Sequence, residues 1–332
     1  MSVHALTPPR SAKPLIALVV PCYNEQEVLP LTIGRLGDVL AAMSADGLVD
    51  PSSFVVFVDD GSRDATWTLI EQAASNDPAH FRGVRLARNS GHQAALLAGL
   101  EYVNGRCDAS VSLDADLQDD VSVIALMVKR FRGGAEMVLG VRQSRETDTW
   151  FKRTTANGFY KLMRLMGVSI QDNHADYRLM SGKAMDNLER FSETNMFLRG
   201  VVPLLHGRID LVHYDRKSRE AGTTKYPLSK MLALAWNGIT SFSTVPLRMI
   251  MYLGAVIFLV SLALAMYALW GALAGHSVPG WASIVVPLYV LGGLVMLSIG
   301  IVGEYLGKVF LEAKRRPRYF IDATTHGDEH HG

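Results

Sequence analysis

Residues 112–118 (SLDADLQ) place two carboxylates, Asp114 and Asp116, and one amide, Gln118, directly after a short apolar run at 109–111. The apolar run predicts the end of a β-strand, and the residues that follow have helical spacing. Carboxylate and amide oxygens are ligands that Mg²⁺ or Mn²⁺ prefers, and such ions often join protein carboxylates to phosphates. The stretch therefore predicts a site for a divalent metal and a diphosphate. Taken alone, the stretch equally suits a solvated turn or an N-cap of the helix that starts near Asp119, although we expect Asp119 and Asp120 to be the capping residues.

Apolar runs and helical segments alternate along the first half of the chain. The runs predict strands at 15–20, 54–58, 84–87, 109–113 and 137–141. The segments between them predict helices at 25–43, 65–74, 92–103 and 121–131. This alternation predicts an α/β fold, an open and mostly parallel sheet with helices on both faces.

Polar residues follow four of the predicted strands. The clusters begin at Tyr23, Asp59, Arg88 and Asp114. In open parallel sheets, ligands bind at the carboxyl ends of the strands. We therefore expect these four clusters to lie at one edge of the sheet and to form one binding site.

The composition and the missing motifs exclude several classes of protein. The 332 residues have a formal net charge of only +1, which argues against a nucleic-acid partner. The two cysteines, Cys22 and Cys107, form no disulfide framework and suit a reducing compartment. The chain has neither G-x-G-x-x-G after the first predicted strand nor a P-loop, so it resembles neither a classical dehydrogenase nor a P-loop NTPase.

Residues 249–303 contain no Asp, Glu, Lys or Arg. Two stretches in this region, at about 249–273 and 284–303, are long enough to cross a bilayer. Arg248 precedes the pair and a basic segment follows it, so the positive-inside rule places both ends in the cytoplasm. We expect a flexible tail at 1–13, a catalytic domain at 14–227 and an interfacial helix at 228–248. A transmembrane hairpin at 249–306 and a basic cytoplasmic tail at 307–332 complete the predicted organisation.

Four motifs carry a resemblance to a known family: residues 20–25 (VPCYNE), 58–64 (VDDGSRD), 88–92 (RNSGH) and 113–118 (LDADLQ). In order and spacing they resemble the successive motifs of family 2 glycosyltransferases, which have the GT-A fold. The chain is most similar to the polyprenyl-phosphate glycosyltransferases, a group that includes dolichol-phosphate mannose synthases and bacterial undecaprenyl-phosphate sugar transferases. The resemblance covers nearly the whole chain, including 221–226 (AGTTKY), 244–248 (TVPLR) and 303–307 (GEYLG).

The resemblance implies a nucleotide-sugar site and a metal site at the strand ends. Gln118 is expected to add a carbonyl oxygen to the metal ligands Asp114 and Asp116, as it does in related synthases. The expected nucleotide-sugar contacts are Pro21, Tyr23, Glu25, Asp60, Arg88, Asp114, Ala115, Asp116 and Arg142. Each contact has an alternative. Glu25 could be an acid in the first turn of a helix, where the helix dipole favours negative charge. The Asp59–Asp60 pair could be part of a turn, and Arg88 or Arg142 could be an ordinary surface residue.

Asp176 lies in residues 175–179 (ADYRL), which resemble a family segment that usually reads Gly-Asp-aromatic-Arg. In the family this Asp is the proposed base of an inverting displacement, and we expect Asp116, Asp176 and Arg178 to form the catalytic set. Ala175 departs from the usual Gly. A phosphate monoester is largely ionised at pH 7, so the acceptor needs little deprotonation. Asp176 alternatively orients the acceptor, stabilises positive charge on the sugar, or simply pairs with Arg178 or a neighbouring Lys.

Basic residues are expected to contact the lipid acceptor. The segment 150–166 has the pattern of a basic amphipathic helix at a membrane surface, or of a surface helix packed on the domain. Arg216, Arg219 and Lys225 form a second basic cluster and are the expected ligands of the acceptor phosphate. Attraction to anionic lipid headgroups explains the same cluster without catalysis.

The sequence thus predicts a membrane-anchored, metal-dependent, inverting glycosyltransferase of the cytoplasmic membrane. It would move a sugar from a nucleotide diphosphate, UDP more than GDP, to undecaprenyl phosphate, and close helix packing allows a homo-oligomer. One alternative is a processive polysaccharide synthase, which needs a Q-x-x-R-W segment and a larger membrane channel. The other is a non-catalytic scaffold that binds the lipid carrier.

Overall fold

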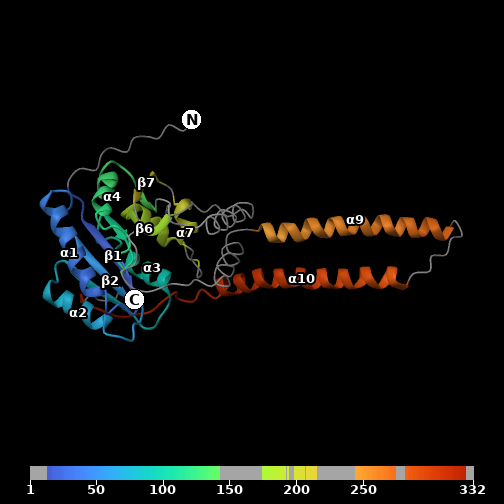
Figure 1. Cartoon of the computed structure of the whole chain (residues 1–332), viewed down its shortest axis with the longest axis horizontal. Helices are drawn as coiled ribbons and strands as arrows, with labels where there is room; N and C mark the ends of the chain where they lie inside the picture. Colours follow the sequence, from blue (N-terminus) through green and yellow to red (C-terminus); the bar gives the residue numbers. More distant parts are fainter. Residues whose placement is uncertain are drawn as a thin grey trace. The chain divides into compact units, whose positions relative to one another are not determined.

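The structure is a computed structural model that describes residues 13–142, 174–191, 193, 198–205, 207–214, 244–273 and 281–326 (Figure 1). The chain forms two compact units. The first contains a sheet with its helices and is built from parts of Met1–Thr149, Gln171–Thr224 and Arg316–Gly332. The second contains the long helices α9 and α10 and lies within Trp150–Ile170 and Lys225–Arg315.

The first unit is organised around an eight-stranded sheet with the strand order β7-β5-β6-β4-β1-β2-β3-β8. Neighbours β4, β1, β2 and β3 are parallel to one another, and β5 is parallel to β7. β6 runs antiparallel to both β4 and β5, and β8 runs antiparallel to β3. The strands are β1 (Ile16–Cys22), β2 (Phe54–Asp59), β3 (Phe81–Leu86), β4 (Ala109–Ser112), β5 (Met137–Arg142), β6 (His174–Ser181), β7 (Ile209–Tyr214) and β8 (Ile321–Thr324).

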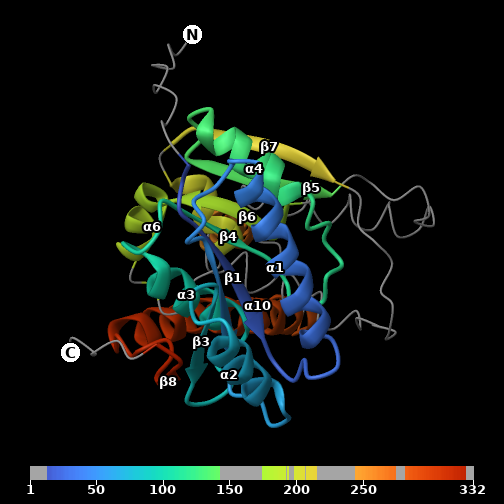
Figure 2. The ribbon, with the colours of Figure 1, turned by 90° about the vertical axis from the view of Figure 1, so that its left-hand side faces the viewer.

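Helices cover both faces of this sheet. The side chains of α1, α2 and α4 share one apolar core with alternate residues of the strands, and Figure 2 shows α1 and α4 on the same side of the sheet. α3 packs on the other face, where a Cβ added to Gly99 would lie 2.4 Å from Val19 Cγ1. The described helices of this unit are α1 (Leu29–Ala45), α2 (Thr66–Asn76), α3 (His92–Val103), α4 (Val123–Arg132), α6 (Gly182–Glu189), α7 (Leu198–Val201) and the 3₁₀ helix η1 (Val202–Leu204).

The mostly parallel α/β sheet predicted from the sequence is confirmed, and β1 and β2 are buried along their whole length as continuous apolar runs require. Two boundaries differ from the prediction. Pro21 lies inside β1 rather than ending it. α1 begins at Leu29, because Pro30 suits the first turn of a helix, so Glu25 lies before the helix and is not a first-turn acid.

The C-terminal segment differs from the expected cytoplasmic tail at 307–332. α10 continues to Ala313, and residues 321–324 form β8 at the edge of the sheet. Backbone hydrogen bonds extend this edge, since Ala87 N donates to Phe320 O (2.8 Å) and Gly83 N donates to Thr325 Oγ1 (2.8 Å). Arg318 also donates to the backbone oxygen of Glu193 (2.9 Å). Residues 318–325 are therefore a structural part of the first unit.

The second unit contains α9 (Val245–Leu273) and α10 (Trp281–Ala313), which run antiparallel and contact each other (Figure 1). Within the described residues, one stretch, Leu291–Ala313, is long and apolar enough to cross a membrane. It overlaps the second expected span, at 284–303. In α9 the apolar stretch that the structure describes, Val245–Ile257, is shorter than a span requires.

Candidate active site

The candidate site lies where the chain order of the sheet reverses. From β1 the chain continues outward through β2 and β3, and then returns to place β4 on the other side of β1. Loops that leave β1 and β4 therefore separate in opposite directions, and such a switch point is where open α/β sheets bind ligands. The polar cluster after β1 and residues 113–118 after β4 occupy this point.

The loop after β1 is locked to the loop after β2 by reciprocal hydrogen bonds. Asn24 N donates to Ser62 Oγ (2.9 Å), and Arg63 N donates back to Asn24 Oδ1 (2.9 Å). Asn24 adopts a left-handed conformation with φ of 53°, which Asn tolerates better than most residues. Pro21 is buried in the strand, whereas the Tyr23 side chain is exposed and can contact a ligand.

Asp60 shapes the neighbouring loop. Its Oδ1 accepts from Ser90 N (2.7 Å) and its Oδ2 accepts from Gly91 N (2.9 Å), directly before α3. Burial raises the pKa of Asp60, and the two backbone hydrogen bonds act in the opposite direction. Gly61 allows the close approach of the two loops, because a Cβ there would lie 2.7 Å from the Arg88 carbonyl carbon. Asp60, predicted to contact the nucleotide-sugar, thus already accepts two backbone hydrogen bonds, while Arg88 is exposed beside it.

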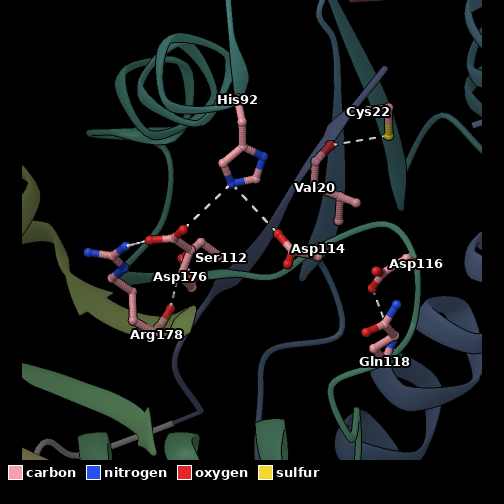
Figure 3. Close-up of polar contacts among 9 residues, drawn as sticks. All are labelled: Val20, Cys22, His92, Ser112, Asp114, Asp116, Gln118, Asp176 and Arg178. Atoms are coloured by element: carbon pink, nitrogen blue, oxygen red, sulfur yellow. Dashed lines mark hydrogen bonds and ion pairs between the residues drawn. The ribbon is translucent and has the colours of Figure 1, made fainter. Parts of the chain in front are cut away.

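The loop after β4 carries the three predicted metal ligands. Figure 3 shows Asp114 directed toward His92, while Asp116 lies beside Gln118. Gln118 N donates to Asp116 Oδ1 (3.1 Å), and Leu117 between them has a left-handed φ of 51°. The Gln118 side chain is 5% exposed, and its Nε2 has no acceptor among the residues that the structure describes. Ala115 is buried, and its carbonyl accepts from Thr32 Oγ1 of α1 (2.8 Å).

Two tyrosines from later strands support the end of this loop. Tyr214 OH, from β7, donates to Asp119 Oδ1 (2.8 Å), and Tyr177 OH, from β6, donates to the Asp120 backbone oxygen (3.0 Å). The two rings meet edge to face, with centroids 5.4 Å apart. The N-cap of α4 is Ser122, and the helix has no side-chain cap hydrogen bond, so the prediction that Asp119 and Asp120 cap it was wrong. Asp120 does shape the turn before the helix, since its Oδ1 accepts from Ser122 N (3.0 Å).

Asp176 reaches the site from β6, which pairs with β4 so that Ser112 lies opposite Arg178. Arg178 NH2 donates to Asp176 Oδ1, and Ser112 Oγ donates to the Asp176 backbone oxygen (2.7 Å). The Asp176 side chain is 12% exposed, but that of Arg178 is only 1% exposed. Arg178 therefore positions Asp176 from behind. With a side chain only 1% exposed, Arg178 lies behind Asp176, and its place in the predicted catalytic set remains a prediction.

His92 joins these two parts of the site and was not among the predicted site residues. Its Nε2 lies 3.6 Å from Asp114 Oδ1 and 3.8 Å from Asp176 Oδ2 (Figure 3). His92 is the first residue of α3, directly after the polar cluster that follows β3. That position at a strand end was the available sequence signal for it.

The charge and the donor atoms of the site suit a hard divalent cation. Burial raises the pKa of Asp114; His92 acts in the opposite direction, and the nearby charges of Asp119, Asp116 and Asp176 raise it further. A cation would offset this concentration of negative charge, and the predicted ligands Asp114, Asp116 and Gln118 each offer a side-chain oxygen atom. Among the described residues, no three His, Cys, Asp or Glu side chains are grouped closely enough to enclose an ion.

Several predicted contacts lie outside the description. Arg216, Arg219 and Lys225 are not among the described residues, and neither are the segments 150–166 and 228–243. Arg142 is the last residue of β5, but its side chain is not described. The roles assigned to these residues remain predictions.

Comparison with solved structures finds distant similarity. The mannosyl-3-phosphoglycerate synthase from Rubrobacter xylanophilus is 17% identical with a TM-score of 0.45, covering 73% of this chain and 75% of that one. The mannosyltransferase PcManGT from Pyrobaculum calidifontis, solved with GDP-Man and Mn²⁺, is 18% identical with a TM-score of 0.42, covering 94% of this chain and 89% of its own.

Sequence relatives are much closer. The pattern described as Glycosyl transferase family 2 matches residues 17–188, which contain the whole described site. A Bacillus subtilis protein named uncharacterized glycosyltransferase YkoT is 47% identical, covering 96% of this chain and 95% of its own. The Escherichia coli prophage bactoprenol glucosyl transferase homolog is 39% identical, covering 92% and 98%. The chain therefore belongs to glycosyl transferase family 2.

Proposed function

We propose that this protein transfers a sugar from a nucleotide-diphosphate donor, UDP in preference to GDP, to undecaprenyl phosphate at the cytoplasmic face of the membrane. The observation that carries the proposal is the pair of carboxylates, Asp114 and Asp176, that face one imidazole from two sides. Asp114 belongs to the loop at the switch point, where a donor diphosphate would bind. Asp176 supplies the second side of the reaction centre.

The lipid acceptor is supported by relatives and by the second unit. Besides the Escherichia coli homolog, a protein named bactoprenol glucosyl transferase from Shigella phage SfX is 38% identical over 92% of this chain. α9 and α10 present large apolar side chains to their surroundings, including Trp270 at 75% exposure. Such a surface is stable in lipid rather than in water. A two-span hairpin with both ends in the cytoplasm matches the basic residues at its two ends.

The chemistry follows from the ionisation of the acceptor. A phosphate oxygen of the lipid attacks the anomeric carbon, the bond from that carbon to the nucleoside diphosphate breaks, and the diphosphate departs. Because the attacking phosphate is already largely ionised at pH 7, Asp176 removes no proton in this step. Its role is to orient the acceptor and to stabilise the positive charge that develops on the sugar ring. Attack from the side opposite to the leaving group gives inversion.

The donor side would be formed by the loops after β1 and β4. Tyr23 offers an exposed ring for the base and ribose, and Arg88 offers a charge for the diphosphate. Asp114, Asp116 and the Gln118 carbonyl would bind Mg²⁺ or Mn²⁺, which as a Lewis acid stabilises charge on the departing diphosphate.

The test is transfer by the purified full chain in lipid nanodiscs that contain undecaprenyl phosphate. Labelled UDP-glucose is offered first, followed by other UDP- and GDP-sugars, each with Mg²⁺. Label should appear in the lipid extract, and Asp176→Asn should lower the rate by about 10²-fold or more, because it removes the negative charge that stabilises the developing positive charge on the sugar. The matched control is Asp186→Asn, an exposed carboxylate on α6 that bonds Asn104. Donor hydrolysis without lipid product, or product in polymer instead of lipid, would contradict the proposal.

A further inference from the structure

One nitrogen atom lies between two carboxylates in this site. His92 Nε2 is 3.6 Å from Asp114 Oδ1 and 3.8 Å from Asp176 Oδ2. Carboxylate oxygens only accept hydrogen bonds, so Nε2 interacts favourably with either of them only if it carries a hydrogen. Both distances exceed the usual range of about 2.7–3.2 Å for an N–H···O hydrogen bond. A single N–H can complete such a bond with one of the two carboxylates, not with both.

The surroundings fix almost everything except the imidazole and Asp114. Asp60 accepts from the backbone N–H groups of Ser90 and Gly91, so the chain that leads into His92 is anchored. Asp176 is fixed through its other oxygen, Oδ1, which accepts from the buried Arg178. The Asp114 side chain, by contrast, is 34% exposed and lies in a loop. A movement of about 1 Å would bring the imidazole into hydrogen-bond range of either partner.

We propose that His92 is a positioning residue that couples the donor side of the site to the acceptor side. Without the nucleotide-sugar donor, the single N–H group of His92 alternates between Asp114 and Asp176. When Asp114 turns toward a divalent cation and the donor diphosphate, it no longer accepts from His92, and His92 donates to Asp176 alone. Asp176 is then fixed at both oxygens, by Arg178 and by His92. The coupling rests on the proposed function, in which Asp114 serves the donor and Asp176 serves the acceptor.

The coupling has an energetic consequence. Donor binding increases the affinity for the acceptor, and by linkage acceptor binding increases the affinity for the donor by the same factor. Removal of the His92 N–H should abolish this factor while leaving the cation ligands in place. A purely structural role for His92 would instead weaken donor binding and acceptor binding together.

The first test is a double-mutant cycle on transfer by the full chain in nanodiscs. His92→Phe preserves a ring but removes the N–H group that donates the hydrogen bond. This variant should lower the transfer rate about tenfold, while the Mn²⁺ dissociation constant, measured with UDP, changes less than threefold. His92→Gln keeps an N–H group that can donate a hydrogen bond and should recover most of the transfer rate. In the Asp176→Asn background His92→Phe should cost less than twofold. An equal loss in both backgrounds, or a parallel loss of Mn²⁺ affinity, would refute the coupling.

A matched control uses another histidine–aspartate pair. His80 Nδ1 lies 2.9 Å from Asp77 Oδ2, and His80 directly precedes β3, at the amino-terminal end of that strand. His80→Phe removes an imidazole from a carboxylate in the same way and should leave the transfer rate unchanged. A loss equal to that of His92→Phe would assign the effect to stability rather than to coupling.

The second test needs no turnover. With ¹³C-labelled histidine in the full chain, the His92 signal is identified by its loss in His92→Gln. Adding Mg²⁺ and UDP should shift this signal, and Asp114→Ala should place it at the shifted position before any ligand is added. A signal that does not move in the wild type, or that stays in place in Asp114→Ala, would overturn the inference. Should the signal move while no sugar-lipid forms, the proposed function fails, and what stands is the ligand-dependent change of the His92 hydrogen bond without its role in coupling donor and acceptor. If sugar-lipid forms while the His92 signal does not move, the proposed function stands and the coupling fails.

Discussion

The two carboxylates that face His92 are supported in different ways. Asp114 belongs to a loop, and the shape of that loop depends on hydrogen bonds from residues distant in the sequence, Thr32 and Tyr214. Asp176 belongs to a strand, and the side chain that fixes it, Arg178, is two residues away on the same strand. The loop carboxylate can turn toward a ligand, whereas the strand carboxylate is already in place. Under the proposed function, the donor side of the site would therefore adapt to its ligand, whereas the acceptor side would be preformed.

The largest effect is expected on the loop side. Asp114→Asn removes one negative charge from the cation site, and loss of a Lewis acid's contribution of several kcal/mol should lower transfer by about 10³-fold. The Mn²⁺ dissociation constant, measured by titration of the full chain with UDP present, should rise at the same time. Asp186→Asn serves again as the control. Normal Mn²⁺ affinity in Asp114→Asn would place the cation elsewhere.

On the strand side the expected effect is on folding. Arg178→Gln leaves the largely buried Asp176 without its guanidinium, and breaking a buried pair in this way costs about 3–5 kcal/mol of stability. Unfolding of the full chain in detergent measures the loss. Arg208→Gln breaks the more exposed pair with Asp210 and should cost about 1 kcal/mol or less. Equal losses in the two variants would show that Asp176 is not preformed.

Removing the hydroxyl of Tyr214 or of Tyr177 shows how much each hydrogen bond contributes to the shape of the loop after β4. Tyr214→Phe loses a hydrogen bond to a carboxylate, worth about 1.5–3 kcal/mol, and Tyr177→Phe loses one to a backbone carbonyl, worth about 1 kcal/mol. The Mg²⁺ concentration for half-maximal transfer should therefore rise more in Tyr214→Phe than in Tyr177→Phe. The reverse order would mean that Asp119 contributes little to the shape of the loop.

The smallest effect concerns the two cysteines beside β1 and β4. Burial raises the pKa of the Cys22 thiol well above its usual value and that of Cys107 to about 12. Because the thiolate is the reactive form, neither residue should react measurably with iodoacetamide at pH 7.5 in the folded protein. Mass spectrometry should detect alkylation only after denaturation. Rapid labelling of Cys22 in the folded protein would show that the end of β1 opens readily.

The parallel part of the sheet could be predicted because its signals are local. The apolar runs of β1 and β2 are continuous, and the predicted bounds of α3 match the observed His92–Val103. β6, β7 and β8 were not predicted. β6 contains a buried arginine whose burial is possible only beside Asp176, and β8 has four residues that form a strand only against the edge of β3.

Several residues of the candidate site could be predicted one by one, but which of them lie next to one another could not. The motifs identified Asp114 and Asp176, yet their common neighbour His92 depends on where α3 begins and on how β4 pairs with β6. Asp60 shows the same limit. Its carboxylate was expected to face a ligand, and only the three-dimensional path of residues 88–91 reveals two backbone N–H groups as its partners.

The pairing of β8 with β3 sets an order of events during synthesis. The ribosome makes β8 after α9 and α10, so the edge of β3 stays open while both apolar helices leave the exit tunnel. Domains generally fold as units in the order in which they are made, but this sheet is complete only once residues 321–324 have been made. The catalytic unit is therefore completed only after the helices that we propose to span the membrane have been released for insertion.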